Sequence, residues 1–248
     1  MQTGMPTITG LLLDPVGCLA EFPPGPFHEI AVRFFGRKGK ASPSGSRSYW
    51  HLLNLMEAAE TPLDGERRNA VEALEAEAVA GASVYEDVLP VLAELTTMGI
   101  RLAISSSLSR AAAMRFVERC SLGEFFSGVW TRDDAGGVKL APLLRALGGA
   151  SLTPEKTMFL TDTVEGIRVA RSAGVHAVLM MNDPDEARRL AMHNPAGGVV
   201  SLHEIPDFLR LIAAQNQRRL RIGEYPAQVE AIGAVKPEGD LLKPSGRP

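Results

Sequence analysis

The sequence predicts an α/β protein with a doubly wound, Rossmann-like parallel sheet of about five strands and an inserted helical cap. Short apolar segments of strand length alternate with helical patterns along most of the chain, and the first such segment ends in an acid. About sixty residues after that segment contain helical patterns alone. Alternating strands and helices are typical of right-handed crossovers, which place ligands at the carboxyl ends of the strands near the point where the strand order reverses.

The expected strands are continuous apolar runs, the pattern of strands that are buried on both faces of a parallel sheet. The first covers residues 7–14 with the sequence TITGLLLD. The other four are expected at 100–107, 156–162, 176–181 and 197–202. Helical patterns occupy the intervening residues 87–98, 108–120, 141–147, 165–173 and 184–192. Several of these patterns are followed by a glycine, which favours a helix end.

The helical cap is expected at residues 21–83, inserted between two parts of the core at 1–20 and 84–214. Its helical patterns cover 27–36, 48–60 and 65–80. The segments EFPPGP and GAS are expected to connect it to the core, and a lobe beside an active site can act as a lid. From residue 215 to 248, scattered proline and glycine predict a poorly ordered tail.

Composition fits a packed protein and gives no electrostatic reason to expect a polyanionic partner. Of the 248 residues, 45% are hydrophobic and 22% are charged, and the formal net charge is −3, so we expect no nucleic-acid partner. Cys18 and Cys120 belong to no metal-binding spacing, which favours a reducing compartment. No apolar run approaches the ~20 residues of a membrane span, so we expect a cytoplasmic protein without a membrane partner.

Polar residues end the first two expected strands, where a doubly wound sheet binds its ligands. Asp14 follows the first strand, and Gly17 shortly after it lets the backbone approach a ligand closely. Ser105, Ser106 and Ser107 end the second strand, where hydroxyls and helix amides can bind phosphate. An equally open interpretation is that Asp14 turns the chain and that Ser107 or Ser109 caps the next helix.

A lysine and a second pair of acids occur later in the chain. Lys139 follows Gly-Gly-Val, so a flexible loop could bring its ammonium towards a negative centre, although most single lysines are solvated. Asp162 ends the strand at 156–162, and Glu165 lies within one turn of it. Acids at neighbouring strand ends can share a divalent cation such as Mg²⁺, but the same acids could also favour a helix terminus.

The order of these residues resembles the motif order of the haloacid dehalogenase-like superfamily. LLLDPVGCL is similar to its first motif, LAISSS to the second, GGVK to the third and FLTDTVEG to the fourth. ASVYEDVLPVLAELTTMGIRLAI resembles the return from a small helical cap in the phosphoglycolate phosphatase and haloacid dehalogenase branch. The fourth motif, together with FFSGVW and ISSS, is similar to the enolase-phosphatase (acireductone synthase) branch.

The resemblance implies a Mg²⁺-dependent phosphatase that acts on a small phosphorylated metabolite. Asp14 would attack the phosphoryl group and form an aspartyl-phosphate. Mg²⁺ would lie between Asp14, the Val16 carbonyl and Asp162, with Glu165 as a further candidate ligand. Ser105, with Ser106, would hold phosphoryl oxygens, and Lys139 would neutralise charge on the nucleophile and the phosphate.

The chain departs from the family pattern at several positions. Val16 stands where the phosphatases carry an acid that protonates the leaving group, and general acid–base help is typically worth ~10²–10⁴-fold in rate. Thr161 stands where many relatives have glycine or a second acid, and Gly166 where some have aspartate, which predicts weaker metal binding. Cys18 replaces a common threonine and is expected to pack rather than to react.

Two other functions stay open on these residues. A halide leaves without protonation, so Val16 also fits metal-independent hydrolysis of a carbon–halogen bond. A catalytically degraded relative that binds a phosphate ligand or a protein partner would account for Val16 and the altered fourth motif together.

Overall fold

The computed structural model describes residues 6–36, 42–59, 65–181 and 192–223 and confirms the predicted doubly wound α/β fold. All strands of the main sheet are parallel, in the order β5-β4-β1-β6-β7-β8. They are β1 (Gly10–Leu13), β4 (Arg101–Ser105), β5 (Phe126–Trp130), β6 (Thr157–Thr161), β7 (His176–Met180) and β8 (Gly197–Val199).

The sheet has one strand more than the sequence predicts. β5 lies at the edge beside β4, and none of its residues is fully buried. Its sequence FSGVW therefore lacks the continuous apolar run by which the five predicted strands were recognised.

The helices of the sheet domain mostly lie where the sequence places them. They are α4 (Val88–Thr97), α5 (Arg110–Arg119), α6 (Arg132–Ala135), α7 (Leu140–Gly149), α8 (Val164–Ser172) and α10 (Glu204–Gly223), with a 3₁₀ turn, η2 (Pro154–Lys156), before β6. The helix predicted at 184–192 falls almost wholly outside the described residues. The tail predicted from 215 is wrong as far as residue 223, because the Gln- and Arg-rich sequence there continues α10 and both residue types favour helix.

The strand order reverses at β1, which makes its carboxyl end the switch point of the sheet. The chain passes from β1 to β4 on one side and later to β6 on the other, so β1 pairs with both. Every residue of β1 is buried. The residues that follow these three adjacent strands are Asp14, Ser106 and Asp162, and they meet at one edge of the sheet.

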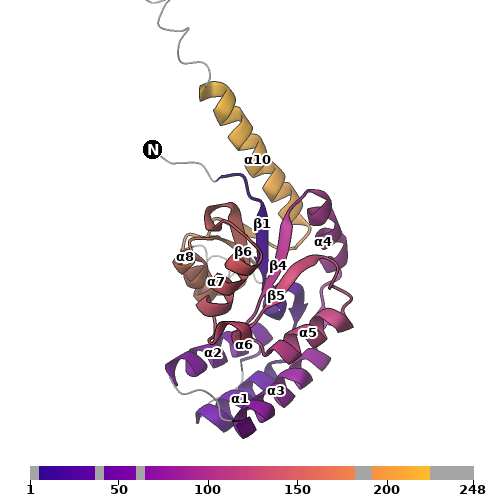
Figure 1. The fold of residues 1–248 in the computed structure, drawn as a ribbon, viewed down its shortest axis with the longest axis vertical. Coiled ribbons are helices and arrows are strands. Elements are labelled where there is room, and N and C mark those ends of the chain that lie inside the picture. Colours follow the sequence, from indigo (N-terminus) through magenta and orange to yellow (C-terminus); the bar gives the residue numbers. More distant parts are fainter. Residues whose placement is uncertain (1–5, 37–41, 60–64, 182–191, 224–248) are drawn as a thin grey trace, which may run out of the picture.

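Three helices lie between β1 and the other strands of the sheet along the chain. We call α1 (Pro24–Phe35), α2 (Gly45–Ala58) and α3 (Gly65–Ala80) the helical insertion. A tight turn, η1 (Pro15–Leu19), leads from β1 into a small antiparallel pair, β2 (Ala20–Glu21) and β3 (Ser83–Val84), at the base of the insertion. Figure 1 shows the insertion beyond the carboxyl end of β1, with α10 at the opposite end.

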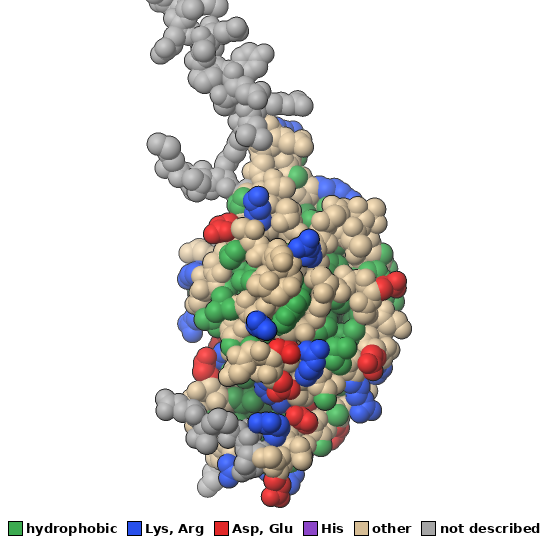
Figure 2. Space-filling model, in the orientation of Figure 1, with side chains coloured by type: hydrophobic (Ala, Val, Ile, Leu, Met, Phe, Trp, Pro, Cys, Tyr) green, Lys and Arg blue, Asp and Glu red, His purple; other side chains and the backbone are tan. Residues whose placement is uncertain are grey.

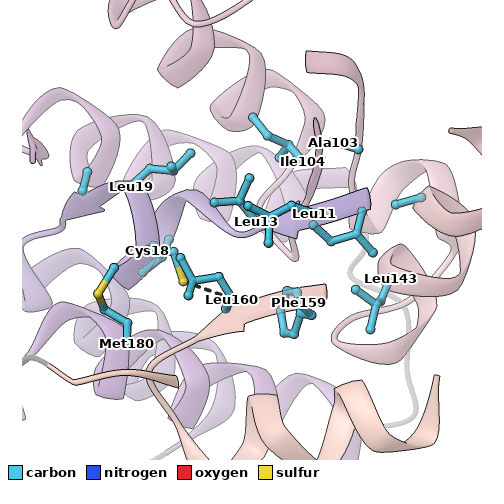
Figure 3. Packing of buried hydrophobic residues seen from close by; sticks show 14 of the residues in the cluster. Leu11, Leu13, Cys18, Leu19, Ala103, Ile104, Leu143, Phe159, Leu160 and Met180 are labelled. Atoms are coloured by element: carbon cyan, nitrogen blue, oxygen red, sulfur yellow. Dashed lines mark hydrogen bonds between the residues drawn. The ribbon is translucent and has the colours of Figure 1, made fainter. Parts of the chain in front are cut away.

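The apolar core extends from the sheet to the end of β1. Leu11 and Leu13 of β1 pack with residues of β4 and β6 (Figure 3). Cys18 lies beside them in η1, where it is buried and its thiol donates to the Leu160 carbonyl at 3.2 Å. Burial raises the pKa of Cys18, so its thiol stays protonated and packs, in keeping with the prediction from the sequence.

Candidate active site

Asp14 lies at the switch point with its carboxylate almost completely buried, at 5% exposure. The carboxylate accepts hydrogen bonds from the Val16 N–H at 3.2 Å, the Ser106 hydroxyl at 3.1 Å and the Tyr49 hydroxyl at 3.3 Å. Burial raises the pKa of Asp14 to about 7, and the nearby charge of Asp162 also raises it. A carboxyl group that changes charge near neutral pH at a switch point is a candidate for chemistry.

Asp162 follows β6 and faces the turn that follows Asp14. Its Oδ1 accepts a hydrogen bond of 2.7 Å from the Ser46 hydroxyl of α2. Gly17 has a φ of 82°, and a Cβ at that position would lie 2.6 Å from Asp162 Oδ2. Only glycine therefore allows η1 to approach this carboxylate, and the structure brings together the two acids predicted to share a cation.

Of the two serines predicted to hold phosphoryl oxygens, Ser106 is the one whose hydroxyl reaches Asp14. Ser106, rather than Ser105, donates to the Asp14 carboxylate, while Ser105 is the buried last residue of β4. The Ser107 N–H donates to the Tyr49 hydroxyl at 2.8 Å. Three identical residues in a row carry no signal of which side chain turns towards the neighbouring strand, so the sequence could not fix this register.

Lys139 lies at the start of α7, but its ammonium is directed to the helical insertion. Its Nζ donates to Asn54 Oδ1 at 2.5 Å and to Glu57 Oε2 at 2.7 Å, both on α2. Its backbone N–H donates to the Ser107 hydroxyl at 2.7 Å. The structure thus places Lys139 beside the serine run, with its charge paired to the insertion instead of to Asp14.

The other predicted metal ligands are only partly brought together. Val16 is buried in η1 with its N–H on Asp14. Glu165, in the first turn of α8, lines a separate cavity, and the described part of the chain holds no group of three or more Asp, Glu, His or Cys side chains that could bind a metal. Two carboxylates at neighbouring strand ends, close enough for the charge of Asp162 to raise the pKa of Asp14, still suit Mg²⁺, because this ion usually binds one or two carboxylates and keeps several water ligands.

The sequence analysis missed the contribution of the helical insertion. Ser46 and Tyr49 of α2 reach the two acids, and Glu75 of α3 forms a buried ion pair with Arg132 of α6. A cavity of about 270 Å³ lies between α2 and the start of α8. It is lined by Arg47, Trp50, His51, Asn54, Thr163, Val164 and Glu165. Helical periodicity identified these helices, but it does not show which of their polar side chains reach the residues at the ends of the strands.

The chain is similar to known proteins in sequence and in structure. The family model described as haloacid dehalogenase-like hydrolase matches residues 50–180. Enolase-phosphatase E1 of Schizosaccharomyces pombe is 26% identical over 107 residues, which cover 41% of this chain and 49% of that protein. Tyrosine-protein kinase PtkA of Mycobacterium tuberculosis is 26% identical over 100 residues, 40% of this chain and 34% of the kinase.

The matched segments thus span between a third and a half of these curated relatives. Among solved structures, CbbY from Rhodobacter sphaeroides in complex with phosphate superposes with a TM-score of 0.59 at 18% identity and covers 80% of this chain and 96% of CbbY. The family match covers more than half of the sequence, from within α2 to the end of β7. The chain belongs to the haloacid dehalogenase-like hydrolase family.

Proposed function

We propose that this protein is a Mg²⁺-dependent phosphatase of a small phosphorylated metabolite and that it works through an aspartyl-phosphate on Asp14, which water then hydrolyses to phosphate and free Asp14. The observation that carries the proposal is the convergence on one point of a buried carboxylate, the Ser106 hydroxyl and the Ser107 N–H, next to a second carboxylate from Asp162. Phosphoryl transfer needs positioning and charge stabilisation more than covalent chemistry, and these groups supply both.

Asp14 would act as the nucleophile in its charged form. Its pKa of about 7 leaves much of it protonated at neutral pH when no cation is bound. A divalent cation held by Asp14, Asp162 and the Val16 carbonyl would favour the charged carboxylate and offset the charge of the phosphoryl group. The Ser106 hydroxyl and the Ser107 N–H would hold phosphoryl oxygens, and Lys139 would add positive charge once it leaves Glu57.

The leaving group would depart without help from residue 16. Val16 is an alkyl side chain buried in the core and has no proton to donate. Turnover should therefore depend strongly on the leaving group, with aryl and acyl phosphates cleaved faster than alkyl phosphates. The cavity between α2 and α8, whose lining residue Thr163 directly follows Asp162 in the chain, is our candidate for the part of the substrate beyond the phosphate.

The test is phosphate release by the purified full chain across a panel of metabolites, with p-nitrophenyl phosphate and a simple alkyl phosphate included. We expect release that requires Mg²⁺, is abolished by EDTA and falls by at least a hundredfold in D14N and D162N. Absence of Mg²⁺-dependent release from every compound in the panel would overturn the proposal.

A second candidate, carbon–halogen hydrolysis, is favoured by the same Val16 side chain, since a halide needs no proton. It would use Asp14 as the nucleophile but no cation. Halide release from a 2-haloacid that survives EDTA and is lost in D14N would select this function over phosphatase activity.

A further inference from the structure

One face of α2 contacts the residues that match the four family motifs. Ser46, Tyr49, Asn54 and Glu57 lie within an arc of about 140° around a helix of 3.6 residues per turn, and the buried Trp50 and Leu53 lie in the same arc. We call these four residues the α2 polar face. Each of them donates to, or accepts from, a residue that the sequence analysis connected with catalysis or its immediate neighbour.

The Tyr49 hydroxyl occupies the position that an anionic oxygen would take. It accepts the Ser107 N–H at 2.8 Å, lies 3.4 Å from the Ser106 hydroxyl and is 3.3 Å from Asp14 Oδ2. A backbone N–H and a hydroxyl at the end of a strand are groups that bind phosphoryl oxygens. A phosphoryl group within bonding reach of Asp14 Oδ2 would overlap the present position of this hydroxyl.

The remaining members of the α2 polar face engage the charged groups of the site. Ser46 donates to Asp162 at 2.7 Å, on the carboxylate proposed to hold the cation. Asn54 and Glu57 accept the Lys139 ammonium at 2.5 and 2.7 Å. The helix thus places hydroxyl donors on the two acids and a carboxylate on the lysine. In a complex with metal and phosphate, the cation would contact the same acids and the anion the same lysine.

The contact is packed and not a surface encounter. Tyr49 is 1% exposed, and its ring lies 5.2 Å from the Phe27 ring and 6.3 Å from the Trp50 ring, measured between centroids. The Glu75–Arg132 ion pair attaches α3 to the same side of the core. Both helices therefore hold the insertion against the site.

We propose that the α2 polar face is an autoinhibitory element: Tyr49 competes with the phosphoryl group for the Ser106 and Ser107 donors, and α2 must withdraw before substrate binds. The inference rests on the proposed phosphatase function and adds to it a closed, self-occupied ground state. The observed free energy of phosphate binding is then the difference between the free energy of the phosphate contacts and that of the Tyr49 contacts that phosphate replaces.

The experiment compares Tyr49→Phe with the wild-type protein and with Tyr85→Phe in the full chain. Tyr85 loses the same hydroxyl, but its partner is Glu21 at 3.5 Å, outside the α2 polar face. Inorganic phosphate is titrated in saturating Mg²⁺ by calorimetry. Removal of the Tyr49 hydroxyl leaves the buried Ser107 N–H without its acceptor in the closed state, so we expect phosphate to bind Y49F about tenfold more tightly than it binds wild type, with Y85F unchanged.

The outcomes separate this inference from the function on which it rests. Equal phosphate affinity in wild type, Y49F and Y85F, or weaker affinity in Y49F, overturns autoinhibition and leaves the phosphatase proposal in place. Absence of phosphate binding in all three proteins, together with no Mg²⁺-dependent phosphate release, overturns both.

A measurement on a chain with Tyr49 intact decides the matter if Y49F does not fold. The chain has two tryptophans, so Trp130→Phe leaves Trp50, next to Tyr49 and 4% exposed, as the reporter of α2. Saturation with Mg²⁺ and phosphate is expected to shift its fluorescence to longer wavelength as α2 withdraws. Unchanged fluorescence at a phosphate concentration that calorimetry shows to be saturating contradicts the withdrawal.

Discussion

Asp14 is deeply buried, but its carboxylate must carry a charge to react. These two properties conflict, because burial disfavours the charged form. Its position after a fully buried strand causes the burial, and burial raises its pKa to about 7. Three hydrogen bonds, from Val16, Ser106 and Tyr49, limit that rise by stabilising the charged form. The residue thus stays close to the balance between its two forms, and a bound cation can decide which form dominates.

The first prediction concerns stability against pH in the absence of divalent ions. Because the native state holds the Asp14 proton more tightly than the unfolded state does, the contribution of Asp14 to stability falls as pH rises from about 4 to about 7. D14N has no such charge, so its stability relative to wild type should rise over this range, by about 4 kcal/mol at most. Urea unfolding at several pH values measures the difference.

The matched control is D207N, which changes an aspartate that is largely exposed on α10. Its stability relative to wild type should vary by no more than about 0.5 kcal/mol over the same range. A D14N difference as flat as that of D207N would show that Asp14 titrates as an ordinary exposed carboxyl group.

The second prediction concerns the cation. Because charged Asp14 and Asp162 repel each other, Mg²⁺ should raise the melting temperature of wild type more at pH 8 than at pH 5.5, where Asp14 is protonated. D162N should lose most of this gain at pH 8. Differential scanning fluorimetry with and without Mg²⁺ gives the shifts, and a gain that is equal at both pH values would speak against a cation on Asp14.

At the scale of elements, the contact between the end of β6 and the start of α8 connects two departures from the family pattern, Thr161 and Gly166. Thr161 is the buried last residue of β6, and Gly166 lies in the first turn of α8. A Cβ on Gly166 would lie 1.8 Å from Thr161 Oγ1 and 2.7 Å from its Cβ. The threonine fills the space that a side chain at 166 would need, so glycine at 166 is a packing requirement of this chain.

The third prediction is a double-mutant cycle at this contact. G166A should destabilise the protein by about 2–3 kcal/mol through overpacking. T161G/G166A should be more stable than the sum of the two single changes by at least about 1 kcal/mol. G148A in α7, where a Cβ meets open space, is the control and should be neutral or stabilising. Additive effects in the cycle would show that the two sites do not compete for space.

Elements that follow from local periodicity could be predicted, whereas those set by tertiary context could not. Every residue of β1 and of β6 is buried, and their sequences are the continuous apolar runs that such burial requires. The sequence therefore predicted both strands and the acids that follow them. β5 is a half-buried edge strand, and η1 contains Gly17 at a φ of 82°, a geometry that no periodic pattern encodes. Tyr49 was missed because the apolar pattern of α2 does not show which residues of the sheet domain its inward face meets.

At the scale of the whole molecule, the site is closed by contacts between the helical insertion and the sheet domain. Acidic and basic side chains are interspersed where the two parts meet on the face in Figure 2. Inside, the Glu75–Arg132 pair is 2% and 8% exposed, and Glu75 also accepts the Ser109 N–H at the start of α5 at 3.1 Å. No helix in the described ranges is long and apolar enough to cross a membrane.

The fourth prediction concerns this buried pair. E75Q leaves the Arg132 charge buried without its counter-charge, which typically costs 3–5 kcal/mol, so we expect a loss of about 3 kcal/mol in urea unfolding. E94Q removes one partner of an exposed pair with Arg210 and should cost less than about 1 kcal/mol. Equal losses in the two variants would mean that the Glu75–Arg132 pair is effectively solvated.

The most direct test of the account is a crystal structure of the full chain with Mg²⁺ and beryllofluoride, which mimics a phosphoryl group on a carboxylate. We predict a beryllofluoride bound to Asp14 Oδ, with Mg²⁺ ~2.0–2.1 Å from oxygens of Asp14, Asp162 and the Val16 carbonyl. An unmodified Asp14 at saturating ligand, or a cation bound without both aspartates, would contradict it.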